Sequence, residues 1–169
     1  DDRPCSFRFP RGSCLGLEMP ENILPLDIGK GEVIQEGQNI ALLNFGARLS
    51  ACKEVAVNLN KKGINITLID AKFAKPLDTK LIDLILDNHE YLLTVEEGSI
   101  GGFSSLVLDY VHNKRNKTIK SKINNIIFPD IFIDHDTVEN QYKIIGMDSK
   151  SIENKILSFS NNIDLELKK

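Results

Sequence analysis

From Leu26 onward, short runs rich in apolar and β-branched residues alternate with longer stretches in which apolar residues recur at helical spacing. The run Ile40–Phe45 is typical of a buried central strand. The stretch that follows places apolar residues from Leu49 to Leu59 along one face of a helix. This alternation is typical of βαβ units. We therefore expect a three-layer α/β fold with a mostly parallel open sheet and one antiparallel edge strand.

The individual elements follow from the same periodicity and from their end signals. Gly29–Ile34 is predicted as the antiparallel edge strand. The other strands are expected at residues 40–45, 64–69, 91–95 and 123–128. Helices are expected at about 47–62, after Asp78 as N-cap, after the glycine turn 98–102, after Thr137, and after Ser149.

The first 25 residues differ in character from the rest of the chain. They contain four of the six prolines and show no sustained period. We interpret residues 1–25 as an extended arm, the tail of a preceding domain, and residues 26–169 as one compact domain. A length of 169 residues suits one substantial core. The chain has no initiator Met and no leader at its start, so we expect it to be a fragment.

Composition excludes several classes of protein. Lys and Arg number 21 against 24 Asp and Glu, so no overall positive field attracts nucleic acid or anionic lipid. No apolar run approaches the roughly 20 residues that a membrane span needs. Cys5, Cys14 and Cys52 match neither a zinc ribbon nor a dithiol redox motif, so we expect reduced thiols. We expect no partnership with nucleic acid or membrane.

A dinucleotide site at the strand ends is disfavoured. The strand ending at Phe45 is followed by Gly46 alone, where the fingerprint needs three glycines for backbone and pyrophosphate to touch. Asp70 lies where a ribose-binding acid would be found, yet without the glycine loop it is better interpreted as a strand-end cap.

The turn Gly98–Gly102 is a stronger candidate for anion binding, because a glycine turn before a helix exposes free N–H groups. Glu96 and Glu97 directly before it would repel an anion. We therefore favour a structural role for the glycines, in positive φ and close packing. General acid–base work by the glutamate pair lacks a visible partner.

Two further clusters have structural interpretations. Asp134, His135 and Asp136 are metal-capable, but three adjacent residues rarely converge on one ion, so a turn capping the next helix is favoured. The basic run from Lys114 to Lys122 lacks interleaved aromatic residues and is interpreted as a solvated connector rather than a nucleic-acid site. From its residues alone, the compact domain has no self-contained active site.

The arm carries Arg8-Phe9-Pro10-Arg11-Gly12. Proline stiffens the backbone between the two arginines and glycine permits close approach, which suits a guanidinium that binds phosphate or carboxylate. An interdomain salt bridge explains the same residues equally well.

Six segments in order carry a family resemblance. They are Arg8–Gly12, Ile28–Val33, Ala41–Gly46, Lys72–Asp78, Thr94–Gly98 with Gly101-Gly102, and Pro129–His135. Together they resemble the C-terminal third of the 1-deoxy-D-xylulose-5-phosphate synthase family. Transketolases and 2-oxo acid dehydrogenase beta subunits share the acid-acid-glycine strand end, but the arm motif and the Pro-Leu-Asp and Pro-Asp segments favour the synthase.

The resemblance implies a thiamine-diphosphate and Mg²⁺ enzyme that joins pyruvate, with loss of CO₂, to D-glyceraldehyde 3-phosphate. It implies a transketolase C-terminal-like domain in a homodimer, whose cofactors belong to preceding domains. The chain alone should then be inactive. Arg11 matches the position that holds the substrate phosphate, and Arg8 is assigned to interdomain support. No role carries over to Glu96, Glu97, Asp134 or His135.

Two alternatives remain open: a non-catalytic assembly or regulatory module, and a fragment of a 2-oxo acid dehydrogenase beta subunit. The family implies a plastid-type organelle or bacterial cytoplasm, and the frequency of Asn, Lys and Ile favours the organelle. An isolated domain should expose an apolar face that normally meets the rest of the enzyme, so we expect weak self-association.

Overall fold

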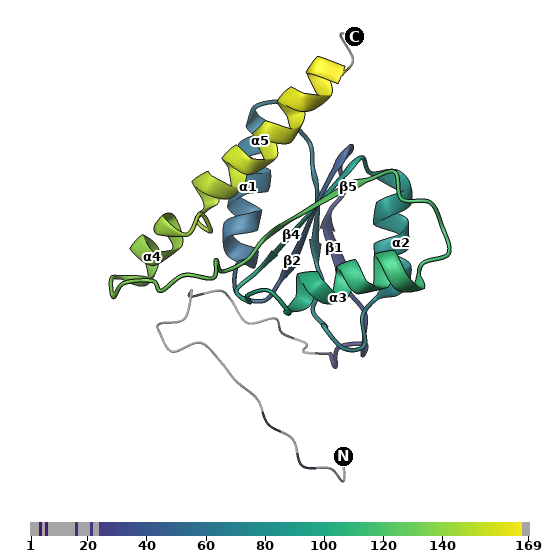
Figure 1. Cartoon of the computed structure of the whole chain (residues 1–169), viewed down its shortest axis with the longest axis horizontal. Coiled ribbons are helices and arrows are strands. Elements are labelled where there is room, and N and C mark those ends of the chain that lie inside the picture. Colours follow the sequence, from purple (N-terminus) through teal and green to yellow (C-terminus); the bar gives the residue numbers. More distant parts are fainter. Residues whose placement is uncertain (1–3, 5, 7–15, 17–20, 22–23, 167–169) are drawn as a thin grey trace.

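The structure is a computed structural model that describes residues 4, 6, 16, 21 and 24–166, with side chains placed as far as residue 158. Its elements alternate along the chain as strands and helices (Figure 1). In order they are β1 (Glu32–Gln35), β2 (Ile40–Phe45), α1 (Leu49–Lys61), β3 (Thr67–Asp70), α2 (Thr79–Asn88), β4 (Tyr91–Glu96), α3 (Phe103–Asp109), the π-helical turn η1 (Tyr110–Lys114), β5 (Lys122–Ile126), α4 (Val138–Ile144) and α5 (Ser149–Glu166).

The strands form one five-stranded sheet in the order β1-β3-β2-β4-β5. β1 runs antiparallel to β3, and all the other neighbours are parallel. In the centre, Ile40 of β2 is in register with Tyr91 of β4, and Phe45 with Glu96. The prediction of a mostly parallel sheet with one antiparallel edge strand is confirmed.

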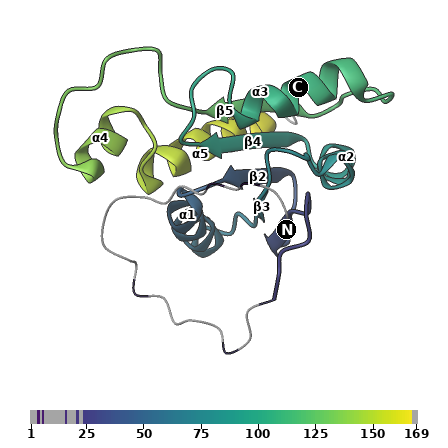
Figure 2. The same ribbon diagram turned by 90° about the horizontal axis from the view of Figure 1, so that it is seen from below.

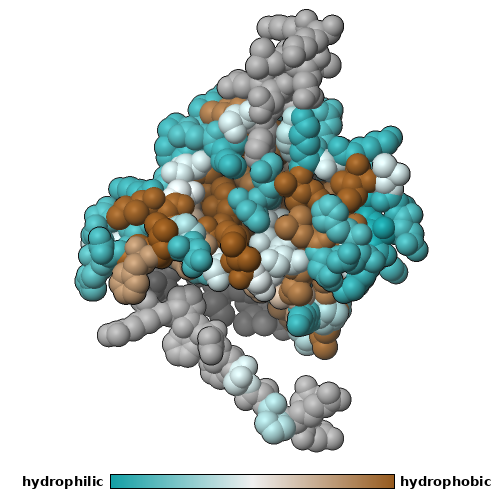
Figure 3. Space-filling view, viewed as in Figure 1, coloured by the Kyte–Doolittle hydropathy of each residue, from teal (hydrophilic) through white to brown (hydrophobic). Residues whose placement is uncertain are grey.

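Helices cover both faces of this sheet, which makes three layers (Figures 1 and 2). α1 and α5 pack on one face over side chains such as Leu42 and Leu93. α2 and α3 pack on the other face over Leu43 and Leu92. Neighbouring strand residues alternate between the two cores, as the period of two in a strand requires. Polar side chains cover much of the outer surface, with apolar ones showing over α4 (Figure 3).

Helix starts follow the predicted capping chemistry at two positions and shift at a third. Asp78 Oδ1 accepts the Leu81 N–H at 3.1 Å and Thr137 Oγ1 accepts the Asn140 N–H at 3.3 Å. At the last helix the predicted Ser149 is its first residue, and Asp148 supplies the cap by accepting the Lys150 and Ser151 N–H groups.

Strand boundaries differ from the prediction where loops compete for backbone hydrogen bonds. β1 begins at Glu32 because a turn at Asp27–Lys30, closed by an N–H···O bond of 3.1 Å, takes up the first residues. β3 begins at Thr67 because the Asn65 carbonyl accepts from Gln38 in the loop after β1, and the Ile66 carbonyl accepts from the side chain of Gln35 at the end of β1. β5 ends at Ile126 rather than 128.

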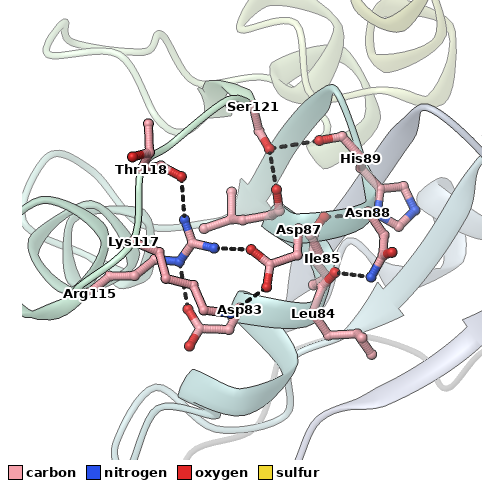
Figure 4. Close-up of polar contacts among 11 residues, drawn as sticks. Asp83, Leu84, Ile85, Asp87, Asn88, His89, Arg115, Lys117, Thr118 and Ser121 are labelled. Carbon is pink, nitrogen blue, oxygen red and sulfur yellow. Dashed lines mark hydrogen bonds and ion pairs between the residues drawn. The ribbon is translucent and has the colours of Figure 1, made fainter.

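We call the edge at which the parallel strands begin the amino edge of the sheet. It is closed by Arg115, whose side chain is only 1% exposed (Figure 4). Arg115 Nε donates to Asp83 at 2.7 Å, one terminal nitrogen donates to Asp87, and the other donates to the Thr118 carbonyl at 3.3 Å. The prediction of a solvated connector is therefore wrong at Arg115, which fixes the segment before β5 to the outer side of α2.

Two hydroxyl groups complete the amino edge. Ser121 Oγ lies within hydrogen-bonding distance of the carbonyls of Leu86 and His89, at 2.9 and 2.7 Å, at the end of α2 (Figure 4). Thr67 Oγ1 accepts the Gly37 N–H at 2.9 Å and lies 2.7 Å from His89 Nε2. The loops before β2, β4 and β5 are thus joined to one another, and to the start of β3, by polar contacts within the domain.

Candidate functional site

The opposite edge, where β2 to β5 end, is the carboxyl edge. After β2 the chain crosses to β3 on one side, and after β3 it returns to place β4 on the other side of β2. Ligand sites in open α/β sheets form outside the carboxyl ends at such a switch point. The residues that follow β2 and β4 are therefore the first candidates for a functional site.

Glu96, the last residue of β4, is fully engaged inside the protein. It is 2% exposed, and its two carboxylate oxygens accept the N–H groups of Phe103 at 2.8 Å and Ser104 at 2.7 Å. A carboxylate at this position satisfies the free donors of α3 and complements the positive end of its dipole. Glu96 is thus the cap of α3, and the glutamate pair has no acid–base arrangement here.

The glycine turn is explained by the same carboxylate. A Cβ atom at Gly98 or Gly102 would lie only 2.4 or 2.5 Å from Glu96 Oε2, and Gly101 has φ of +99°. Glycine is therefore required at all three positions, by space or by backbone conformation. The structural interpretation of these glycines is confirmed, and the alternative of a bound external anion is wrong because the Glu96 carboxylate occupies that place.

Three residues from separate segments meet beside the switch point. Tyr142 of α4 donates its hydroxyl to Glu97 Oε1 at 2.5 Å, and the Arg48 guanidinium lies 3.8 Å from the centre of the Tyr142 ring. Burial raises the pKa of Tyr142, and the Glu97 carboxylate raises it further. Because 45 residues separate Tyr142 from Glu97, no sequence spacing could predict this cluster.

A cavity of about 330 Å³ adjoins the cluster, between α4 and the first turns of α1 and α5. Its charged lining residues are of both signs: Arg48, Glu54, Glu139, Lys143 and Asp148. Within the part of the chain that the structure describes, Arg48 Nε is buried without a hydrogen-bond partner. The space beneath α4 is bordered by charged side chains and only partly filled, so this helix is not packed as a core element.

A second, smaller cavity of about 110 Å³ lies under α3 beside β5. Thr94 of β4 and Ser104 of α3 line it, each 1% exposed, and neither hydroxyl has a partner among the described residues. A polar cavity of this size has room for ordered water, which would satisfy both hydroxyls.

The remaining predicted candidates take structural places. Asp136 Oδ1 accepts the N–H of the cap residue Thr137 at 2.6 Å, so the Asp134–Asp136 segment forms the turn that leads into α4, the structural role that was predicted. Asp70 Oδ1 accepts the Lys72 N–H at 3.2 Å, which confirms the strand-end cap. Arg8 and Arg11 lie outside the described residues, so their roles stay predictions, as does the domain boundary at residue 26.

The described side chains include neither a reactive thiol nor a cluster of three metal ligands. Burial raises the pKa of the Cys52 thiol to about 12, and its Sγ lies 3.7 Å from Asn44 Oδ1. Over the described residues, no three His, Cys, Asp or Glu side chains gather as metal ligands.

Across the described part of the chain, no helix has the length and hydropathy needed to span a bilayer.

The sequence matches a family model described as the transketolase C-terminal domain over residues 29–152. This match covers well over half of the chain. The chain belongs to the transketolase C-terminal domain family. The family match places it in the setting of a transferase-type enzyme.

Solved structures of transketolases share the fold of this domain. A split-gene transketolase, described as an inactive beta4 tetramer, superimposes with a TM-score of 0.70 at 20% identity, covering 80% of this chain and 43% of that chain. The transketolase of Campylobacter jejuni gives 0.55 at 16% identity, covering 77% of this chain and 18% of that one. The chain therefore spans less than half of either relative.

Thiamine diphosphate and a divalent metal are the cofactors that this family generally uses. The described residues do not fit them, because Glu96 occupies the N–H groups after the glycine turn and no three metal-ligating side chains gather. Cofactor chemistry is therefore not assigned to the described part of this domain.

Proposed function

We propose that this chain is the C-terminal part of a 1-deoxy-D-xylulose-5-phosphate synthase. The full enzyme would condense pyruvate with D-glyceraldehyde 3-phosphate, with loss of CO₂, to give 1-deoxy-D-xylulose 5-phosphate. The product would serve isoprenoid synthesis by the non-mevalonate route, and also thiamine and pyridoxal synthesis. Preceding domains would bind thiamine diphosphate and Mg²⁺, the enzyme would be a homodimer, and this chain alone would be inactive.

The observation that carries the proposal is the ordered set of six segments, above all the arm motif Arg8–Gly12 together with Lys72–Asp78 and Pro129–His135. Their placement in the fold supports it. The segments that end β2 and β4, and those that follow β3 and β5, all lie at the carboxyl edge, and Ile28–Val33 enters antiparallel β1 from that edge. Motifs gathered at one edge are typical of a shared functional face.

Arg11 is the residue of this chain that we assign to the substrate. Its guanidinium would hold the phosphate of glyceraldehyde 3-phosphate through charge-assisted hydrogen bonds. A phosphate-binding arm serves a phosphorylated acceptor. It has no evident purpose in an assembly module or in a 2-oxo acid dehydrogenase beta subunit.

The test is steady-state kinetics of the full-length enzyme, with pyruvate and either glyceraldehyde 3-phosphate or unphosphorylated glyceraldehyde. We expect Arg11→Ala to lower kcat/KM about 30- to 1,000-fold for the phosphorylated acceptor only, since one charged contact contributes about 2–4 kcal/mol. Arg8→Ala, the matched control, should affect both acceptors equally through domain packing.

Two outcomes would contradict the proposal at different levels. Equal losses on both acceptors with Arg11→Ala would make Arg11 an interdomain contact and leave the synthase reaction standing. No 1-deoxy-D-xylulose 5-phosphate from the unmodified enzyme would remove the synthase and favour the assembly module. As to compartment, we place the enzyme in a plastid-type organelle, with bacterial cytoplasm as the alternative, which immunolocalisation would decide.

A further inference from the structure

Four large apolar side chains are exposed in one short segment of the chain. Phe132 is 97% exposed, and it is joined by Ile131, Val138 and Ile144 in α4 and the loop before it. We call these four residues the α4 surface, and Figure 3 shows apolar side chains gathered over this helix and loop. Scattered exposed apolar residues are ordinary, but a cluster of this kind marks an interaction site.

The helix beneath these side chains is weakly held by the domain. None of the seven residues of α4 is buried. Its inner side rests on Tyr142, which contacts Glu97 and Arg48, and the cavity of about 330 Å³ adjoins it. A helix with few buried apolar contacts has low local stability, so an outside partner would order it.

The size of the α4 surface says what can cover it. An exposed Phe supplies about 200 Å² and the three partly exposed aliphatic side chains about half as much each, so the surface is on the order of 500 Å². A stable interface between separate proteins needs about 800 Å² per partner. Because a little over half of such an interface is apolar, the α4 surface supplies about as much apolar area as one interface of this size contains.

Relatives of this chain are longer polypeptides that continue beyond the part matched here. This chain covers 43% of the split-gene transketolase chain and 18% of the Campylobacter one. The segment that carries Phe132 also belongs to the carboxyl edge, where the Phe128 N–H donates to the Gly98 carbonyl at 2.8 Å and joins the loops after β5 and β4.

We propose that the α4 surface docks against an apolar surface on a preceding domain of the same enzyme, with Phe132 as its central contact. The inference rests on the proposed function only in requiring the longer enzyme, not in requiring its reaction. Docking buries Phe132 and fixes α4, and through Tyr142 it also fixes Glu97 and Arg48 beside the switch point.

The test is amide hydrogen exchange, read by mass spectrometry, in the full-length enzyme and in the 169-residue chain. We expect peptides covering residues 131–144 to exchange at least about tenfold more slowly in the full-length enzyme, because docking suppresses local opening. Peptides covering residues 113–120 at the amino edge should exchange alike in both forms. This readout does not depend on which reaction the enzyme performs.

Two variants make the test specific to the α4 surface. Phe132→Glu should return the exchange of residues 131–144 to the rate of the chain alone, while leaving the chain's own melting temperature unchanged because Phe132 is exposed. Val57→Glu is the matched control, since Val57 is 51% exposed on α1 and lies between Lys53 and Lys61 at helical spacing. It should keep the slow exchange.

The outcomes separate the two proposals. Equal exchange of residues 131–144 in both forms overturns the docking inference, whatever the enzyme synthesises. If exchange of residues 131–144 in the 169-residue chain becomes slower as the protein concentration is raised, the inference is also overturned, because a second copy is then the partner. Slow exchange in a full-length enzyme that makes no 1-deoxy-D-xylulose 5-phosphate supports docking and removes the proposed reaction.

Discussion

The two edges of the sheet are built on different principles. At the amino edge, the polar groups of the loops find partners within the domain, around Arg115, Ser121 and Thr67. At the carboxyl edge, apolar side chains such as Ile100 and Phe132 point into solvent, and every described segment of the family resemblance gathers there. The comparison teaches that one edge completes the domain and the other continues beyond it.

Breaking the amino edge should have the largest effect on stability. Arg115→Leu leaves Asp83, Asp87 and the Thr118 carbonyl without their common donor. Since the two carboxylates are 31% and 42% exposed, solvent offsets part of the loss, and we expect about 2–4 kcal/mol from the free energy of unfolding in urea.

Lys117→Met is the control for this change, because Lys117 contacts the same Asp87 from a half-exposed position at 2.6 Å. Its cost should be much smaller than that of Arg115→Leu, because solvent screens this exposed pair. Similar losses in the two variants would mean that burial of Arg115 contributes nothing special, and the amino edge would no longer differ from an ordinary charged surface.

At the carboxyl edge, the two adjacent glutamates should differ in how much they contribute to the stability of the domain. Glu96→Ala removes the carboxylate that caps α3 and leaves the Phe103 and Ser104 N–H groups buried without acceptors, so the free energy of unfolding in urea should fall by about 2 kcal/mol.

Glu97→Ala removes only the partner of Tyr142 and should loosen α4 with little change in the urea midpoint. Amide exchange of residues 138–144 reads the second effect. A large urea shift for Glu97→Ala would contradict a weakly attached α4.

The smallest effect concerns the stability of the protein at low pH. The hydrogen bond between Asp87 and Lys117, together with the charges of Lys117 and Arg115, lowers the pKa of Asp87 below the ordinary 3.8. The stabilisation is therefore complete above pH 3.8 and is lost as the pH falls further through the folded-state pKa. Urea midpoints followed from pH 6 to pH 3 should fall less steeply in Lys117→Met than in the unmodified chain. Parallel curves would show that this pair does not contribute.

Much of the fold could be predicted because local rules and tertiary packing agree. The strand Ile40–Phe45, the Asp78 cap and the antiparallel edge strand follow from apolar period and cap chemistry. Boundaries shifted where residues distant in sequence took over hydrogen bonds, as Gln35 and Gln38 do at Ile66 and Asn65.

The polar contacts, at the amino edge as well as at the candidate site, were less predictable for a physical reason. Arg115 resembles any solvated basic residue in sequence, and only the fold brings it between Asp83 and Asp87. Tyr142 and Glu97 meet in the same way, through contacts between distant segments. Periodicity shows which face of an element is buried, but it does not show which polar side chains meet across the fold.

The most direct test of the difference between the edges is thiol labelling of two single variants, Phe132→Cys at the carboxyl edge and Asn116→Cys at the exposed amino edge. The unmodified protein gives the background from Cys5 and Cys14, which we expect to be reduced, and Cys52 should stay silent because it is buried and its pKa is raised to about 12. We predict that both introduced thiols react rapidly with a maleimide in the 169-residue chain. In the full-length enzyme, the thiol at position 132 should react at least about tenfold more slowly, while the thiol at 116 keeps its rate. Equal labelling of both positions in the full-length enzyme, or slowing at position 116 alone, would contradict the account.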